Sequence, residues 1–384
     1  MTLPAVEPTK PITDVPQLLA HLHDAARLEL STIPLYLYAA YSIQTQSYSQ
    51  WAPGISAFRA IRSVVIEEML HLSLVRNLVV AAGGGDGIRF YDEAFVPTYP
   101  SPMLHRVPTL VLHLEPCTPK LMRTVFMPLE LPAKTDAPPQ PDTYNTIGQF
   151  YAAIEQGFER LASELGDELW AHNRPDLQYA RAYWNQDGGG EPIVVTDLIT
   201  ALEAMRTIVE QGEGVAPHRA TVPLDPVSPK TGLGELSHYA KFRRIAEGVD
   251  GIGAVWPVPT DPKIADYEGP VRLLAEFANA AYCYVLCLID AIYAATSDTI
   301  KAGERSERYR LERSFIAAMG GLLFTIADVL VQNGAAPTFE FHRFDDGTPK
   351  RDQLAARCDE LLGSFPSLGG DDGVRQLIRR LPPL

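Results

Sequence analysis

The stretch VVIEEMLHLSLVRNL (residues 64–78) decides the fold, because it places two carboxylates and an imidazole inside an apolar helix. Apolar residues recur there every three or four positions, which is the spacing of one helix face. Glu68 and His71 lie three residues apart on that face, whereas Glu67 falls beside it. Burying an ionised group costs several kcal/mol unless the group is paired or binds a metal. We therefore expect Glu68 and His71 to meet a partner in the core, and Glu67 to meet either solvent or the outer side of a metal ligand.

The same Glu-x-x-His spacing returns in ELSH (residues 235–238), which places Glu235 and His238 on one helix face. One such pair can occur by accident in a chain of this size. Two pairs are typical of helical bundles that bind two metal ions in their core, where each of the two other helices adds one glutamate. The sequence therefore predicts one further buried glutamate on the helix before each motif.

Candidates for both glutamates are present. Glu29 lies on the apolar stripe of the first helix. Before the second motif, LEAMRTIVEQGEG (202–214) offers Glu203, Glu210 and Glu213. Glu213 follows the apolar stripe that ends at Val209, so we choose it as the ligand and keep Glu210 as the reserve. The glycines on both sides of Glu213 either let the backbone unwind near a metal or mark an ordinary helix end.

The predicted ligands are Glu29, Glu68, His71, Glu213, Glu235 and His238. Four carboxylates and two imidazoles form a donor set of oxygen and nitrogen atoms, which suits iron or manganese. Structural zinc sites instead use soft sulfur ligands. Carboxylates gathered in a core also repel each other unless divalent cations neutralise them. We expect two iron ions, with manganese as the alternative metal. Each Glu-x-x-His would supply one carboxylate and one imidazole, and Glu29 and Glu213 would bridge the ions or complete their coordination. The alternative is an apolar bundle with buried polar pairs and no metal.

Helical patterns dominate the rest of the chain, so we predict a mainly α fold, a four-helix bundle with an added helical hairpin and a proline-rich insertion. The bundle helices are expected at about 15–47, 54–82, 196–213 and 233–247, the insertion at 84–145, and the extra helices at 268–333. A further helix is expected at 146–170, and one short helix near 120–126 within the insertion. One domain would span residues 1–340, with a tail at 341–384 packed on it.

Composition excludes several classes of function. The chain has 384 residues and a net charge of −14, which repels nucleic acid and anionic membranes. Its four cysteines form no Cys-x-x-Cys pair, and the start of the chain lacks the basic and apolar segments of a secretory signal. The apolar run at about 271–296 contains Glu276 and Asp290 and fits a buried core helix better than a membrane span. We therefore expect a cytoplasmic protein.

Several of these motifs together resemble a known family. ELSTIPLYLYAAYSI (29–43), IEEMLHLSLVRNLVVAAGG (66–84), IVEQGEG (208–214), ELSHYAKF (235–242) and GAAPTFEF (334–341) resemble the ferritin-like domain of the iminophenyl-pyruvate dimer synthase family of the violacein pathway. The resemblance covers roughly residues 15–342, and it implies the same six metal ligands. Members of this family are associated with specialised metabolism, so the resemblance implies a tailoring oxidase. This chain is shorter than the multidomain synthase, and the resemblance covers its ferritin-like part.

The function expected from residues and resemblance is a non-haem di-iron oxidase or oxygenase that uses O2 on a small, amino-acid-derived metabolite. Its partners would be that substrate and O2, with an electron donor and a homodimer left open, and with neither nucleic acid nor membrane. The alternatives are an iron-storage protein of the ferritin type and a manganese catalase-like enzyme. Tyr36, Tyr239 and Glu67 are candidates for contacts on the outer side of the ligands, although core packing is the simpler explanation for the tyrosines.

Overall fold

The computed structural model describes residues 10–45, 54–85, 87–103, 108–132, 144–180, 190–213, 236–295, 306–370 and 373–384, together with residues 3, 5–8 and 106. These residues form a mainly helical protein, as the sequence predicts. The elements follow one another in this order: α1 (Val15–Ser42), α2 (Ile55–Ala81), β1 (Ser101–Pro102), β2 (Val111–Leu112), α3 (Pro119–Leu121), a π-helical turn (Met122–Phe126), α4 (Met127–Leu129), α5 (Ile147–Leu165), α6 (Leu198–Gly212), α7 (His238–Ala246), α8 (Gly269–Ala294), α9 (Glu307–Ala317), a second π-helical turn (Ala318–Leu323), α10 (Phe324–Gln332), α11 (Lys350–Leu361) and α12 (Val374–Arg379).

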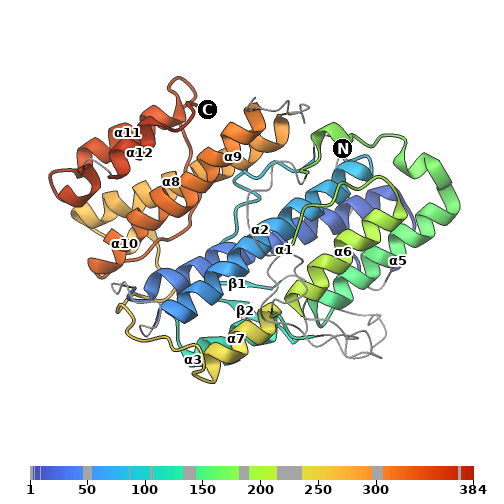
Figure 1. Cartoon of the computed structure of the whole chain (residues 1–384), viewed down its shortest axis with the longest axis horizontal. Coiled ribbons are helices and arrows are strands. Elements are labelled where there is room, and N and C mark those ends of the chain that lie inside the picture. Colours follow the sequence, from blue (N-terminus) through green and yellow to red (C-terminus); the bar gives the residue numbers. More distant parts are fainter. Residues whose placement is uncertain are drawn as a thin grey trace.

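Two long helices, α1 and α2, form the centre of the molecule and pack along each other (Figure 1). The Asp14 side chain starts α1 by accepting a hydrogen bond from the Gln17 amide. The chain enters α2 through Gly54, whose φ of +94° favours glycine. A side chain there would also be 2.8 Å from the Ile252 carbonyl oxygen. Both helices are buried over most of their length, which explains why their apolar spacing is so regular.

The remaining bundle helices approach the central pair from two directions. Helices α5 and α6 pack on each other, α5 contacts α1, and α6 contacts α2. Helix α7 packs instead on α2 and on the π-helical turn 122–126 of the insertion, as Figure 1 shows. The end of α6, the start of α5 and the start of α7 therefore approach the middle of α1 and α2. This meeting point is where the polar residues of the core gather.

The proline-rich segment forms a small two-stranded antiparallel sheet and a short helical stretch. In the sheet, Ser101 pairs with Leu112 and Pro102 with Val111. The helix expected near 120–126 is present and runs from Pro119 to Leu129 through α3, the π-helical turn and α4. It ends next to the central helices, which matters for the site described below.

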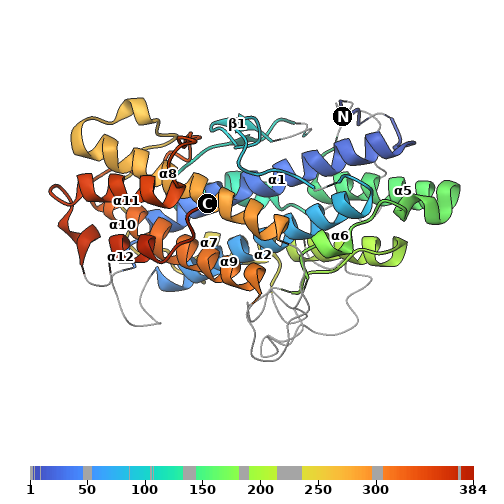
Figure 2. The same ribbon diagram turned by 90° about the horizontal axis from the view of Figure 1, so that it is seen from above.

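The C-terminal third forms a second layer, which lies beside the central helices in Figure 1 and in front of them in Figure 2. Helix α8 is mostly buried, as predicted for a core helix, although its length and composition would also allow it to cross a membrane. The stretch Glu307–Gln332 passes the same test, which is weak evidence because core helices of soluble proteins pass it too. The second of the extra helices expected at 268–333 is divided by the second π-helical turn into α9 and α10. Helix α11 packs on α8, and helix α12 packs on this turn. The domain limit at residue 340 stays a prediction.

Candidate metal centre

Two groups of buried side chains meet in the middle of the bundle. Within each group, three potential ligand atoms lie within 4.8 Å of one another. The His71 half-site consists of Glu29, Glu68 and His71, and the His238 half-site consists of Glu68, Glu130 and His238. All five side chains are at most 3% exposed. The structure thus brings together four of the six predicted ligands and adds one that the sequence analysis missed.

Glu68 belongs to both half-sites, and its carboxylate faces both imidazoles. Its Oε2 atom is 3.6 Å from Nδ1 of His71, and its Oε1 atom is 3.0 Å from Nδ1 of His238. The two imidazole rings are stacked with their centroids 5.4 Å apart. Glu68 is therefore the carboxylate that both half-sites share, whereas the sequence led us to expect Glu29 and Glu213 either to bridge the ions or to complete their coordination.

Glu130 supplies the carboxylate that the sequence analysis did not find. It follows the last residue of α4, and its Oε1 atom lies 3.6 Å from Nδ1 of His238. The surrounding sequence MPLELP shows no apolar helix stripe, so the position of Glu130 relative to such a stripe could not mark it as buried. The available signal was a single acidic residue between two leucines just after the short predicted helix.

Glu213, the carboxylate that we chose on the third bundle helix, contacts the start of α5 and belongs to neither half-site. It follows α6, is 8% exposed, and accepts a hydrogen bond of 2.7 Å from the Gly148 amide at the start of α5. A Cβ atom at Gly148 would be 2.5 Å from Oε2 of Glu213, so the contact needs a glycine there. Neither half-site includes Glu213 or Glu210, which is half-buried on α6. Glu235 lies outside the described residues.

Each imidazole is held from its outer side by a hydrogen bond at Nε2. Nε2 of His71 is 2.9 Å from Oε1 of Gln211, near the end of α6. Nε2 of His238 is 3.0 Å from Oε2 of Glu67, and the same oxygen accepts a 2.6 Å hydrogen bond from Nζ of Lys241. Because both acceptors are oxygen atoms, Nε2 of each ring donates a proton to its outer partner, and Nδ1 faces the carboxylates, where a bound cation would replace the Nδ1 proton.

Two tyrosines fix the carboxylates that are not shared. The Tyr151 hydroxyl donates to Oε1 of Glu29, and the Tyr36 hydroxyl donates to Oε1 of Glu130, both at 2.5 Å. Burial raises the pKa of both phenols well above the usual range, so they remain neutral donors. Tyr36 therefore takes the position on the outer side of the site that we considered for it. Tyr239 follows His238 on α7 and is half-buried.

The charges of these groups are strongly coupled. Burial raises the pKa of Glu29 to about 7 against the opposing hydrogen bond from His71. For Glu67, burial also raises the pKa, but the His238 hydrogen bond and the Lys241 charge outweigh it and lower the pKa to about 2. Burial lowers the pKa of His71, yet hydrogen bonds to Glu29 and Glu68 raise it to about 10. Without cations, protons on the imidazoles balance the buried carboxylates, and bound divalent cations would take over that role.

The donor set fits a pair of divalent cations. Within the described part of the chain, Nδ1 of His238 is buried and makes no hydrogen bond of acceptable geometry, although two carboxylates face it. A buried nitrogen that lacks a well-formed hydrogen bond and is faced by two carboxylates marks a position where a cation would complete the contacts. Three carboxylates and two imidazoles are the mixed oxygen and nitrogen donors that suit iron or manganese.

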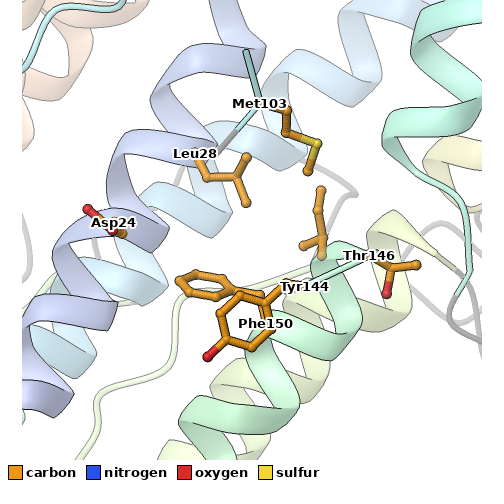
Figure 3. Close-up of a pocket in the computed structure, with 7 residues that line it drawn as sticks. Asp24, Leu28, Met103, Tyr144, Thr146 and Phe150 are labelled. Atoms are coloured by element: carbon orange, nitrogen blue, oxygen red, sulfur yellow. The ribbon is translucent and has the colours of Figure 1, made fainter. Parts of the chain in front are cut away.

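A small cavity lies one helix turn from Glu29, between α1, β1 and the start of α5. Leu28, Met103, Tyr144 and Phe150 line it, and Figure 3 shows Tyr144 and Phe150 side by side at its floor. Its volume of about 10 Å³ is close to the minimum that holds one water molecule. This cavity is therefore too small to be a substrate pocket.

Comparisons with known proteins identify relatives and a fold neighbour of this chain. The chain is 26% identical to the 2-imino-3-(indol-3-yl)propanoate dimerase of Chromobacterium violaceum over 90% of its length, and 24% identical to the dichlorochromopyrrolate synthase of Lentzea aerocolonigenes over 92%. It spans 36% and 39% of those two proteins. The crystal structure of a ferritin-like protein from Caulobacter vibrioides covers 88% of this chain and is itself covered completely, with a TM-score of 0.54 at 21% identity.

The sequence model of one family matches residues 22–247, which contain every residue of both half-sites. The two curated relatives carry the names of enzymes of small-molecule metabolism, and the solved structure shares the fold. Helical architecture, site and family match agree, and the chain belongs to the ferritin-like family.

Proposed function

We propose that this chain is a dimetal carboxylate oxidase that uses O2 to oxidise a small, amino-acid-derived metabolite. One observation carries the proposal: two buried half-sites share Glu68, and each oxygen of its carboxylate faces the Nδ1 atom of a different imidazole. Glu29, Glu68 and His71 would hold one ion, and Glu68, Glu130 and His238 the other. Glu235, outside the described residues, remains a predicted additional ligand. Two bound iron ions would supply the redox chemistry that couples electron loss from a substrate to the reduction of O2.

The protein's own residues contribute geometry and dryness. Tyr151 and Tyr36 hold the two unshared carboxylates, while Gln211 and Glu67 hold the two rings. Because these contacts are formed before any ligand arrives, little reorganisation is needed when cations bind. Burial of the cluster excludes bulk water, which would otherwise compete with the substrate and quench reactive species.

The names of the relatives support the substrate class. One is a dimerase of an α-imino acid that bears an indole ring, and the other is a chromopyrrolate-type synthase. Both names point to metabolites built from amino acids, so the substrate proposed here is an imino or amino acid with an aromatic side chain. In a two-electron oxidation of such a compound, O2 takes up two electrons and two protons and leaves as hydrogen peroxide.

The test is anaerobic loading with ferrous iron, followed by addition of O2 with and without aromatic imino acids. The proposal predicts about two irons per chain and O2 uptake that depends on the organic substrate. Iron oxidation that continues without any organic substrate and deposits many ions per chain would instead indicate storage. Peroxide disproportionation by the manganese-loaded form would indicate a catalase-like enzyme. Failure to retain iron or manganese would refute the dimetal proposal.

A further inference from the structure

We infer that the two half-sites bind metal with unequal affinity and fill in order, the His238 half-site first, because different residues hold the outer sides of the two imidazoles. This inference rests on the proposed function, since it assumes that the cluster binds cations. It concerns Gln211, Glu67 and Lys241, none of which lies in either group of potential ligands.

The inner donors of the two half-sites are closely matched. Each half-site has one Nδ1 atom, one oxygen of the shared Glu68 and one unshared carboxylate. Each unshared carboxylate accepts a 2.5 Å hydrogen bond from a buried tyrosine, Tyr151 for Glu29 and Tyr36 for Glu130. Among the described residues, the clear chemical difference between the half-sites therefore lies behind the imidazoles.

Behind His71 is a neutral amide, and behind His238 is a carboxylate. The Gln211 carbonyl oxygen accepts the Nε2 proton of His71 at 2.9 Å. For His238 the acceptor is Oε2 of Glu67, which is 2% exposed and is held by the Lys241 ammonium group. An anionic acceptor draws the Nε2 proton more strongly and makes the opposite nitrogen a better electron donor to a metal. His238 is thus the stronger of the two imidazole ligands.

Lys241 keeps this carboxylate in place. It lies one helix turn after His238 on α7, so a single short helix carries both the ligand and the cation that anchors the partner of that ligand. The pair of Glu67 and Lys241 adds no net charge, so a general excess of negative charge would not explain tighter binding. The effect acts through the hydrogen bond to His238.

Variants that keep one half-site at a time test the inference directly. His71→Ala keeps the His238 half-site, and His238→Ala keeps the His71 half-site. Cobalt(II) is titrated into each metal-free variant, with binding followed by visible absorption and the dissociation constant fixed by competition with a chelator. We expect His71→Ala to bind one cobalt at least about tenfold more tightly than His238→Ala, the lower end of the range for outer partners of metal ligands.

Exchange of the outer partners then assigns the cause. Glu67→Gln should weaken cobalt binding by about 10- to 100-fold in the His71→Ala background and by less than about threefold in the His238→Ala background. Gln211→Glu should strengthen binding in the His238→Ala background. Its matched comparison is Gln211→Glu in the His71→Ala background, where the expected effect is small.

A second measurement keeps both imidazoles and so does not depend on the alanine variants folding. Native mass spectrometry of the wild-type chain with one equivalent of cobalt should show mainly the one-metal species. Glu67→Gln should reduce the one-metal species toward about half of the chains, with the rest divided between metal-free and two-metal species, because the two sites become more alike. Cobalt absorption spectra that differ between the first and second equivalents in the wild type should become similar in this variant.

Three outcomes would overturn the inference. Equal affinity of the two half-sites, an equal effect of Glu67→Gln in both backgrounds, or an unchanged species distribution in the Glu67→Gln chain would each do so while leaving dimetal binding intact. Failure of the wild-type chain to bind cobalt, iron or manganese would instead refute the proposed function. The two failures are therefore distinguishable.

Discussion

Replacement of Tyr36 by phenylalanine should weaken the binding of one of two metal ions while preserving the fold. The change removes a single hydroxyl, which donates a 2.5 Å hydrogen bond to Oε1 of Glu130. A hydrogen bond to a charged group contributes about 1.5–3 kcal/mol. At about 1.4 kcal/mol for each tenfold change, that range corresponds to a loss of about 10- to 150-fold in affinity. Removal of a hydrogen-bond partner from the outer side of a metal ligand typically lowers metal affinity by a similar factor, about 10- to 100-fold.

The assay is a two-step metal titration of the metal-free chain, and Tyr38→Phe is its matched control. Tyr38 is buried on the same helix and donates its hydroxyl to the Pro259 carbonyl, away from the cluster. Both variants lose one buried hydrogen bond, so both should lower the free energy of unfolding by about 1–2 kcal/mol. Only Tyr36→Phe should weaken metal binding, and only in the His238 half-site. Equal metal affinity in the two variants would refute the placement of Glu130 as a ligand.

Further perturbations address the neighbouring residues. Glu130→Gln should reduce bound iron from about two to about one per chain, as measured by elemental analysis. Glu213→Gln should keep both ions and lower the free energy of unfolding in urea by about 1–3 kcal/mol, because it disturbs the contact to the Gly148 amide. Iron loss only in Glu213→Gln would reverse the assignment of the ligand. Gly148→Ala should cost about 1–3 kcal/mol in urea unfolding, since its Cβ would be 2.5 Å from a Glu213 oxygen, and the cost should fall in a Glu213→Ala background. An equal cost in both backgrounds would contradict that contact. Burial and the nearby Arg357 lower the pKa of His342 to about 4, so its neutral form stabilises the fold above about pH 6.5 and this contribution is lost as pH falls toward 4. His342→Gln should flatten the dependence of the urea midpoint on pH over that interval, and an unchanged slope would exclude His342 as a cause.

Periodicity was sufficient for the ligands that lie on long helices. Glu29, Glu68 and His71 interrupt the regular apolar stripes of α1 and α2, because these helices are buried against each other along most of their length. His238 was found through the repeated Glu-x-x-His spacing. In such helices a polar residue on the buried face is conspicuous, and sequence alone places it well.

Periodicity failed where helices are short or have two partners. Glu130 follows a helical stretch that consists of three brief pieces, too short to show a stripe. Helix α6 packs on both α2 and α5, so its buried face passes through Ala201, Met205, Ile208 and Gly212 rather than through the stripe that ends at Val209. That shift turns Gln211, not Glu213, toward an imidazole.

Outer partners were the least visible from sequence. Glu67 lies beside the apolar stripe, and its pairing with His238 and Lys241 depends on how α7 docks on α2. Tyr151 reaches Glu29 because α5 packs on α1, a contact between residues 122 positions apart. Such contacts follow from tertiary packing, and local sequence patterns do not encode them.

Anomalous X-ray diffraction from iron-loaded crystals tests the central claim most directly. We expect two iron peaks inside the bundle, one next to Nδ1 of His71 and the other next to Nδ1 of His238 and the Glu130 carboxylate, both in contact with Glu68. A single peak, or peaks bound outside these five side chains, would contradict it.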